Sequence, residues 1–466
     1  MLNYSQIFSQ LVRISLFAVI GLLATQTTAQ DITGKWNGQL QVMGTQLRLS
    51  FNISEVDTGY TATMDSPDQN AFGIPVPETS FQDSVLTLSI PSATISYSGK
   101  LNADNEISGE FKQMGRGFPL DLSREKIEKN VVNRPQEPKP PFPYRSENIT
   151  FDNQDADITL AGTLTLPEGK GPFETVILIS GSGPQDRNEE ILEHKPFLVI
   201  SDHLTRNGFA VLRYDDRGVG ESEGVHATGT SADLATDVES AVRYLKGRKE
   251  VQSIGLMGHS EGGILAAMVA ARSKDVDFVV LMAGSAVPGM EILLRQQELI
   301  ARKAGATDDQ IEKSLALNRK IMETVIATPA EEDPTPKVVE IMDNDPMVQV
   351  PQGADRETYL TQQAQSYTST WVRYFLAYDP AEDLRKIKQP VLVLFGGLDL
   401  QVDPDQNLKP MQDALAGNRE AQIIIIREHN HLFQAAETGM VAEYGEIEQT
   451  ISPLVLKTVT DWLRGL

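Results

Sequence analysis

One short stretch constrains this chain more than any other. Residues 253–263 read Ser-Ile-Gly-Leu-Met-Gly-His-Ser-Glu-Gly-Gly, and a second small-residue apolar run follows at 264–268. The pattern predicts a strand, a tight turn that carries Ser260, and a helix. A serine hydroxyl is a weak nucleophile and has to stand clear of its own backbone to meet a base, which such a turn achieves. The same turn directs the N–H of Glu261 to the space beside the hydroxyl. The alternative is a tight strand–helix turn without chemistry.

The Gly-x-Ser-x-Gly pattern occurs a second time, at residues 220–224. It follows a polar loop at 215–219 and leads into 225–229, which has the composition of a further loop. Because no strand precedes it and no helix follows, we interpret Ser222 as part of a solvated turn. Ser260 is therefore the candidate nucleophile.

Residues 1–29 have the pattern of a secretory signal peptide. Arg13 is their only charged residue, an apolar run covers 14–24, and small residues lead up to Ala29. The pattern predicts an exported protein, periplasmic or extracellular, cleaved near Ala29. An uncleaved anchor is the alternative, although the apolar run is short for a membrane span and no later run is long enough.

The composition of the chain limits the classes of partner and cofactor that it is expected to bind. The 466 residues carry a net charge of −23 that is spread along the chain, which disfavours nucleic acid and anionic lipid as partners. No cysteine is present, so disulfides and thiolate metal sites are excluded. His194, His203 and His226 do not pair at metal-ligand spacing, so no metal or other cofactor is expected.

Residues 31–125 are expected to form a small all-β domain, a sandwich or barrel, because short stretches of alternating apolar and polar residues are separated by turn signals. This domain contains no catalytic set of residues, so we interpret it as an accessory module that stabilises the rest of the chain or binds a ligand. The expected strands are 36–42, 46–53, 60–64, 84–90, 95–101, 107–111 and 119–122. A Pro-rich segment at 126–146 is expected to be an extended linker with few tertiary contacts.

Residues 147–466 show strands that alternate with helices, which is typical of a parallel sheet. A segment of about a hundred residues separates the expected strands 278–282 and 391–395, far more than one crossover needs. We expect a helical cap there, at about 286–375, in which Thr307 and Gln310 have the spacing of a capping box. The aromatic cluster Trp371, Tyr374 and Phe375 is a candidate wall of a substrate pocket, or else ordinary packing. The other expected strands are 158–166, 175–179, 210–214 and 422–426, and the expected helices include 196–207, 231–245 and 454–463.

An acid and a base can be assigned after the last two strands. Asp399 comes directly after an apolar strand and two glycines, where a carboxylate can hold an imidazole, whereas Asp403 and Asp405 are expected to cap the next helix. His429 and His431 both follow the final strand. We favour His431 as the base, because it lies further into the loop, where a ring can turn its two nitrogens toward different partners.

Taken together, three stretches resemble an α/β-hydrolase: 258–262 around Ser260, Gly-Gly-Leu-Asp at 396–399, and Asn-His-Leu-Phe at 430–433. Their order, serine then acid then histidine, is the order of that fold, and the resemblance covers about 147–466. Within the fold the chain is most similar to secreted bacterial carboxylesterases and prolyl-oligopeptidase-like serine hydrolases. The resemblance implies a mostly parallel sheet with a helical cap, an oxyanion loop at 180–187 and a structural loop at 215–222. Many members have His-Gly where this chain has Ser180-Gly181.

These observations predict an exported serine hydrolase of small-molecule carboxylic esters. Ser260 would attack the acyl carbon, His431 would take its proton and Asp399 would orient the imidazole, while the N–H groups of Glu261 and Ser182 would receive the oxyanion. A serine peptidase or aminopeptidase of short peptides would use the same residues. A non-catalytic binding protein on a hydrolase scaffold is the third interpretation.

Overall fold

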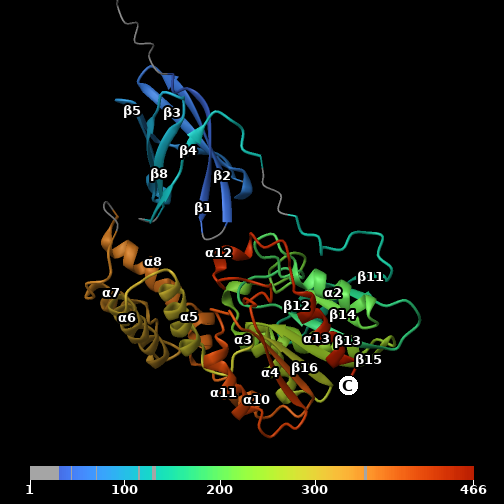
Figure 1. The fold of residues 1–466 in the computed structure, drawn as a ribbon. Helices are drawn as coiled ribbons and strands as arrows, with labels where there is room; N and C mark the ends of the chain where they lie inside the picture. The colour runs from blue at the N-terminus through green and yellow to red at the C-terminus, as the bar shows by residue number, and fades with distance from the viewer. Residues whose placement is uncertain (1–30, 43–44, 70, 114–115, 129–132, 351–353) are drawn as a thin grey trace, which may run out of the picture. The chain divides into compact units, whose positions relative to one another are not determined.

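The computed structural model describes residues 31–466 except 43–44, 70, 114–115, 129–132 and 351–353. The expected signal peptide lies outside the described residues. The chain forms two compact units, one built mainly from residues up to Glu128 and the other mainly from the residues that follow (Figure 1). No helix in the described part is long and apolar enough to cross a membrane.

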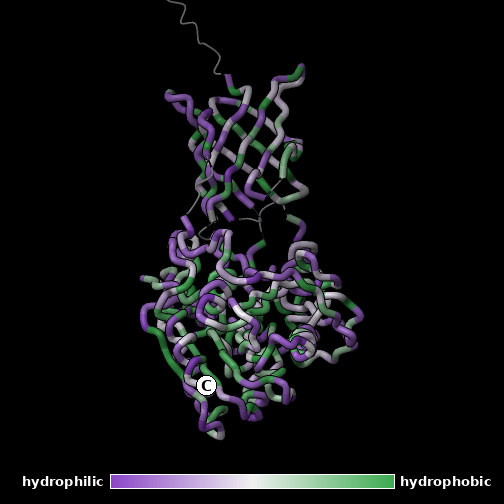
Figure 2. Tube along the Cα trace, turned by 90° about the vertical axis from the view of Figure 1, so that its right-hand side faces the viewer, coloured by the Kyte–Doolittle hydropathy of each residue, from purple (hydrophilic) through white to green (hydrophobic). Residues whose placement is uncertain are grey.

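The first unit is one antiparallel sheet with the strand order β4-β3-β2-β1-β10-β8-β7-β6-β5, and β9 pairs with β8. Because β3 and β4 also contact β5 and β6 from the other end of this order, the sheet curls into a barrel-like shape. Hydrophobic and hydrophilic residues alternate along the strands (Figure 2), with the side chains of Trp36, Phe51 and Tyr97 fully buried. The strands are β1 Gly34–Val42, β2 Thr45–Val56, β3 Gly59–Ser66, β4 Ala71–Val76, β5 Glu78–Gln82, β6 Val85–Ile90, β7 Ile95–Leu101, β8 Ile107–Gln113, β9 Arg116–Pro119 and β10 Leu122–Ser123.

Strands β4 and β5 are absent from the sequence-based expectation, and the single strand expected at 119–122 is wrong, because β9 ends at Pro119 and β10 begins at Leu122. Strand β4 contains Gly73 and Pro75 and exposes Phe72, and β5 buries no residue. Neither therefore has the alternating apolar pattern from which a strand is predicted.

The Pro-rich segment before the second sheet makes extensive tertiary contacts, so the prediction that it makes few is wrong. The guanidinium of Arg134 donates hydrogen bonds to the main-chain oxygens of Leu192, Glu193, Gly445 and Ile447. The amide of Gln136 pairs with the main chain of Thr450 and Ile451. Proline content predicts an extended backbone but carries no information on side chains that anchor the segment.

Arg134→Ala is expected to lower the free energy of unfolding by about 1–2 kcal/mol, because four main-chain oxygens lose a charged donor. Chemical denaturation of the purified protein followed by circular dichroism measures this. Arg385→Ala, at an exposed position of the same unit, is the matched control and should stay within about 0.5 kcal/mol of the wild type. Equal values for the two variants would show that the anchor contributes nothing.

The second unit is built on an eight-stranded sheet with the order β11-β12-β14-β13-β15-β16-β17-β18. The hairpin β11–β12 is antiparallel, β12 pairs antiparallel with β14, and the strands from β14 to β18 run parallel. The strands are β11 Arg145–Asn153, β12 Ile158–Leu166, β13 Phe173–Ile179, β14 Ala210–Tyr214, β15 Val251–His259, β16 Phe278–Met282, β17 Val391–Gly396 and β18 Ala421–Ile426.

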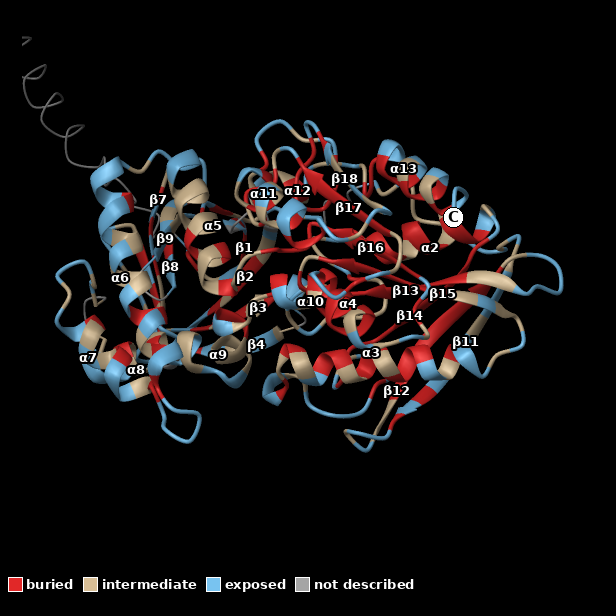
Figure 3. Cartoon of the chain, turned by 90° about the horizontal axis from the view of Figure 1, so that it is seen from below, coloured by how far each residue is buried: buried red, intermediate tan, exposed pale blue. Residues whose placement is uncertain are grey.

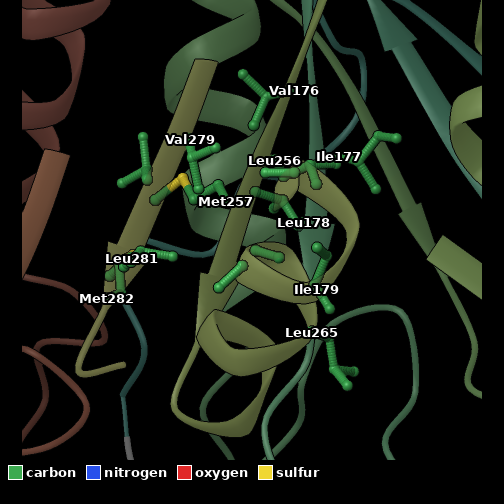
Figure 4. Packing of buried hydrophobic residues seen from close by; sticks show 14 of the residues in the cluster. Val176, Ile177, Leu178, Ile179, Leu256, Met257, Leu265, Val279, Leu281 and Met282 are labelled. Atoms are coloured by element: carbon green, nitrogen blue, oxygen red, sulfur yellow. The ribbon is translucent and has the colours of Figure 1, made fainter. Parts of the chain in front are cut away.

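The central strands are apolar throughout because helices cover both faces of the sheet. Every residue of β16 and β17 is buried, and side chains of β13, β15, β16 and the helix after β15 interdigitate (Figure 4). In Figure 3 the buried strands lie between α3, α4 and α10 on one side and α2 and α13 on the other. These helices and α11 and α12 are α2 Pro196–Arg206, α3 Ser231–Lys246, α4 Glu261–Arg272, α10 Ala381–Leu384, α11 Pro404–Ala414, α12 Val441–Tyr444 and α13 Pro453–Leu463.

Six helices of the described residues lie between β16 and β17: α10, which contacts α4 and α11, and five that form the cap. These five have an apolar core of their own, which includes Leu294, Ile321 and Leu360, and their outer faces are exposed (Figure 3). Thr307 and Gln310 form the predicted capping box at the start of α6. The five cap helices are α5 Gly289–Lys303, α6 Asp308–Ala327, α7 Thr335–Asp343, α8 Arg356–Thr368 and α9 Thr370–Ala377.

Candidate active site

Ser260 occupies the turn between β15 and α4. Its backbone has φ 54° and ψ −118°, a region that a non-glycine residue rarely adopts. The N–H of Ser260 donates to the carbonyl oxygen of Met282 at 2.8 Å, which ties the turn to the end of β16. The surrounding structure thus holds the serine in a strained conformation, as a turn that presents a nucleophile requires.

Two glycines allow this turn to form. A Cβ at Gly258 would overlap the carbonyl group of Gly262, and a Cβ at Gly262 would overlap the carbonyl oxygen of Ile179. Helix α4 therefore packs directly against the ends of β13 and β15. As a result, the N–H of Glu261 lies in the first turn of α4, where N–H groups have no partner within the helix.

Asp399 and His431 come together from the loops after β17 and β18. The Nδ1–H of His431 donates to Oδ2 of Asp399 at 2.8 Å. The other carboxylate oxygen of Asp399 accepts the N–H groups of Gln401 and Val402. Both side chains are buried, so the carboxylate is fully committed to holding the imidazole in one orientation.

Asn430 shapes the loop that carries His431. Its Oδ1 accepts the N–H groups of Leu432 and Gln434, and its side-chain amide donates to the amide oxygen of Gln434. An asparagine side chain is well suited to closing such a turn on its own backbone. In the Asn-His pair of the sequence pattern, Asn430 therefore forms the turn and His431 is positioned by it.

His429 lies apart from Asp399. Its Nδ1–H donates to the carbonyl oxygen of Arg427 at 2.7 Å, and its backbone pairs with Ala435 in an isolated bridge. The ring is therefore bonded to the turn that follows β18. Asp403 is the N-cap of α11, as expected, and Asp405 lies in the first turn of that helix.

The loop after β13 lies directly against Ser260. A Cβ built on Gly181 would lie 3.3 Å from Cβ of Ser260. The N–H of Gly181 donates to Glu189 at 2.8 Å, which leaves the N–H of Ser182 as the loop's candidate oxyanion donor.

Two aspartates of the loop after β14 fix the shape of the loop after β13. Asp216 accepts the hydroxyl of Ser180 and the N–H of Gln185, and its burial raises the pKa of its carboxyl to about 8. Asp215 forms a bidentate ion pair with Arg187. The residues at 215–222 therefore brace this loop, and none of them is among the residues that line the cavity beside Ser260.

Ser222 in the second Gly-x-Ser-x-Gly copy is part of this brace, and the prediction of a solvated turn is wrong. The residue is buried; its hydroxyl donates to the carbonyl oxygen of Asp215 and accepts the N–H of Ala161. Strand β12 supplies that N–H, and the pairing of distant segments is not visible in a local sequence pattern.

His259 and Glu189 are site residues that the sequence interpretation did not identify. The Nδ1 of His259 lies 2.9 Å from Oε1 of Glu189, and its Nε2 lies 3.0 Å from the carbonyl oxygen of His431. The only sequence signal that His259 belongs to the site is its position next to Ser260. Nothing in the sequence pairs Glu189, seventy residues upstream, with it.

Glu261 joins the turn to the cap. Its Oε1 accepts the hydroxyl of Ser231 at 2.6 Å and the indole N–H of Trp371 at 2.8 Å. The residue that offers a main-chain N–H beside Ser260 is thus linked through its side chain to α9.

The loops and the cap enclose a cavity of about 260 Å³. Ser260 and His431 lie in its wall, as do Ser182 and Glu261. The cap contributes apolar residues, among them Ile292, Leu293, Trp371 and Phe375. The remaining polar wall includes Gln185, Gln296 and Gln401. No group of three acidic, histidine or cysteine side chains in the described residues is arranged to hold a metal ion.

Of the three aromatic residues predicted to line the pocket, two lie in the cavity wall and one does not. Trp371 and Phe375 stack at 4.9 Å in the cavity wall. Tyr374 does not line the cavity, because it stacks on Tyr378 at 5.7 Å on another side of α9. Residues 371 and 375 are one helical turn apart and share a face, which residue 374 only partly shares.

Residues 195–435, more than half of the chain, match the family described as serine aminopeptidase, S33. The chain belongs to this family of α/β-hydrolases, and the predicted α/β-hydrolase class is confirmed.

Esterase EstD of Thermotoga maritima is 30% identical to this chain over 290 residues, which are 62% of this chain and 61% of EstD. The chain thus covers less than two thirds of that relative. An uncharacterized 31.7 kDa protein of Escherichia coli is 23% identical over 267 residues, or 56% of this chain and 85% of that protein. Among solved structures, the Pyrococcus furiosus esterase Pf2001 is 15% identical with a TM-score of 0.42, over 73% of this chain and 99% of that chain.

Proposed function

We propose that this protein is an exported serine hydrolase that cleaves carboxylic esters through an acyl-enzyme. The observation that carries the proposal is the buried hydrogen bond between His431 and Asp399, in a cavity whose wall also holds Ser260 in its strained turn. A base that is oriented by a carboxylate and faces a serine hydroxyl is the arrangement that makes serine a nucleophile.

In the first half of the reaction, the Oγ of Ser260 attacks the acyl carbon and its proton passes to Nε2 of His431. Asp399 stabilises the imidazolium that forms. The N–H groups of Glu261 and Ser182 donate to the oxyanion of the tetrahedral intermediate. The intermediate collapses when His431 returns the proton to the alkoxide, and the alcohol leaves.

In the second half, water attacks the acyl-enzyme. His431 accepts a proton from the water as the new C–O bond forms, and then donates it to Oγ of Ser260 as the carboxylic acid departs. The free enzyme is restored, and the net reaction consumes one ester and one water.

The apolar residues that the cap contributes to the cavity wall suit the acyl chain of a neutral ester. Glu189 and Glu261 are 4% and 3% exposed, and both already accept hydrogen bonds from groups of the protein. The amides of Gln185, Gln296 and Gln401 in the same wall carry no charge. The carboxylate of Glu189 is matched by the ring of His259. Oε2 of Glu261 is buried without a hydrogen-bond partner in the described residues, so Glu261 is the carboxylate of the wall that is free to pair with a substrate ammonium. The similarity to an esterase favours the ester.

The purified protein is expected to hydrolyse p-nitrophenyl butyrate with a higher kcat/KM than alanine p-nitroanilide, because the cap lines the cavity with apolar side chains and the similar EstD is an esterase. Parallel assays of the wild type and Ser260→Ala measure this. Faster cleavage of the anilide would identify an aminopeptidase. If neither substrate reacts and Ser260 is not labelled by a fluorophosphonate, the protein is a binding protein on a hydrolase scaffold.

Export is proposed from the pattern of residues 1–29 alone. Expression of the full chain in a Gram-negative host, followed by amino-terminal sequencing of the periplasmic fraction, tests it. A mature chain that begins near Gln30 supports cleavage after Ala29, and a full-length chain confined to the cytoplasm contradicts it.

A further inference from the structure

His259 is a buried residue of the cavity wall that also borders a small apolar pocket, yet both of its ring nitrogens have an acceptor. Met282, Leu432 and Phe433 lie around the ring, and the ring of Phe433 meets it edge-on at 6.4 Å. Burial of an imidazole among such groups normally leaves it neutral, with one N–H. The contacts of His259 instead indicate a charged ring with a hydrogen on both nitrogens.

The carbonyl oxygen of His431 can only accept, so Nε2 of His259 carries a hydrogen. On the other side, Nδ1 faces Oε1 of Glu189, an oxygen that already accepts the N–H of Gly181. Because a carboxylate oxygen can only accept hydrogen bonds, Nδ1 of His259 also carries a hydrogen. The arrangement is therefore an imidazolium between a carboxylate and a carbonyl group.

The resulting chain of hydrogen bonds runs from Gly181 through Glu189 and His259 to the backbone of His431. Its distances are 2.8, 2.9 and 3.0 Å. One end holds the loop that bears Ser182, and the other holds the main chain of the proposed base. The rings of His259 and His431 also lie 4.8 Å apart. The loop of Ser182 and the loop of His431 are thus joined through His259, the residue before Ser260. Both loops have to keep a fixed distance from Ser260 in the proposed reaction.

We propose that His259 is a positioning residue, held as an imidazolium by Glu189, which fixes the loop of the catalytic base relative to Ser260 and the oxyanion loop. The proposal rests on the proposed ester hydrolysis for its kinetic test but not for its spectroscopic one. His259 touches no substrate in this scheme; it acts through the main chain of His431.

The charged groups around the ring agree with this state. Burial lowers the pKa of His259, but the adjacent carboxylate of Glu189, with smaller contributions from the carbonyl of His431 and from Asp399, outweighs burial and raises the pKa above its usual value. The contacts of the imidazolium are therefore complete at neutral and lower pH and are lost as the pH rises through this raised pKa. Loss of either ring proton removes one of the two bonds.

The kinetic test compares pH profiles. Wild-type kcat for p-nitrophenyl butyrate is expected to fall at alkaline pH, and Glu189→Gln is expected to shift that fall to lower pH by about one unit or more, since the amide carries no charge. Glu190→Gln, a change of the neighbouring glutamate at an exposed position of the same loop, is the matched control and should keep the wild-type profile. A Glu189→Gln profile identical to the wild type overturns the proposal.

The spectroscopic test needs no substrate. In protein labelled with ¹⁵N-histidine, the resonances that disappear in His259→Gln are assigned to His259. At pH 7 both ring nitrogens of His259 should be protonated in the wild type, and one should be unprotonated in Glu189→Gln. A neutral His259 in the wild type at pH 7 overturns the proposal, even if the protein proves to be an esterase. If His259 is protonated but the protein does not hydrolyse esters, the positioning role of His259 stands and the proposed function is rejected.

Discussion

Replacing His431 by alanine is expected to lower kcat for ester hydrolysis by three or more orders of magnitude with the fold intact. The ring is the group that takes the proton of Ser260 in the proposed reaction. His259 is also held by a carboxylate, but both of its ring nitrogens are committed, one to Glu189 and one to the carbonyl oxygen of His431. Stopped-flow or steady-state assays with p-nitrophenyl butyrate measure the loss, and circular dichroism verifies the fold.

His429→Ala is the matched control, because it removes the same ring two residues earlier. Its cost should be about tenfold or less, since the ring of His429 donates to the backbone of Arg427 and not to Asp399. The reverse result in folded variants would assign the base to His429.

Asp399→Asn is expected to lower kcat by about four orders of magnitude at neutral pH, the scale seen when an asparagine replaces the carboxylate of such a triad. The amide keeps the shape of the side chain, but it can offer an N–H to Nδ1 and stabilise the wrong tautomer of His431. The N–H groups of Gln401 and Val402 would still have an oxygen to bind.

Asp403→Asn provides the comparison, because Asp403 caps α11 and pairs with Arg295 outside the proposed triad. Its kcat should stay within a few-fold of the wild type, with a loss of about 1 kcal/mol or less in stability. Comparable losses of kcat in the two variants would contradict the assignment of Asp399.

The elements of the second unit are largely predictable from sequence because each carries a local signal. A buried parallel strand is a continuous apolar run, and Ser260, Asp399 and His431 each follow such a run closely. The same holds for Asp403, whose capping role depends only on the next two residues.

What the sequence interpretation missed depends on residues that are far apart in the chain. The anchoring of Arg134 spans more than three hundred residues, the role of Ser222 depends on an N–H of β12, and Glu189 meets His259 across seventy. Tyr374 was grouped with its aromatic neighbours because composition does not determine which face of a helix meets the cavity. Only the assembled fold decides these contacts.

The cap is inserted between β16 and β17, which are neighbours in the sheet and pair directly, Val279 with Val391. The chain thus leaves the sheet and returns to it at adjacent points, whatever lies between. Lengthening, shortening or exchanging the five helices need not move either strand, and a longer excursion costs little additional closure entropy. Ser260, Asp399 and His431 are carried by the sheet, whereas Trp371 and Phe375 are carried by the insertion. Changes to the insertion can therefore alter what the cavity accepts, while the proposed catalytic residues keep their places.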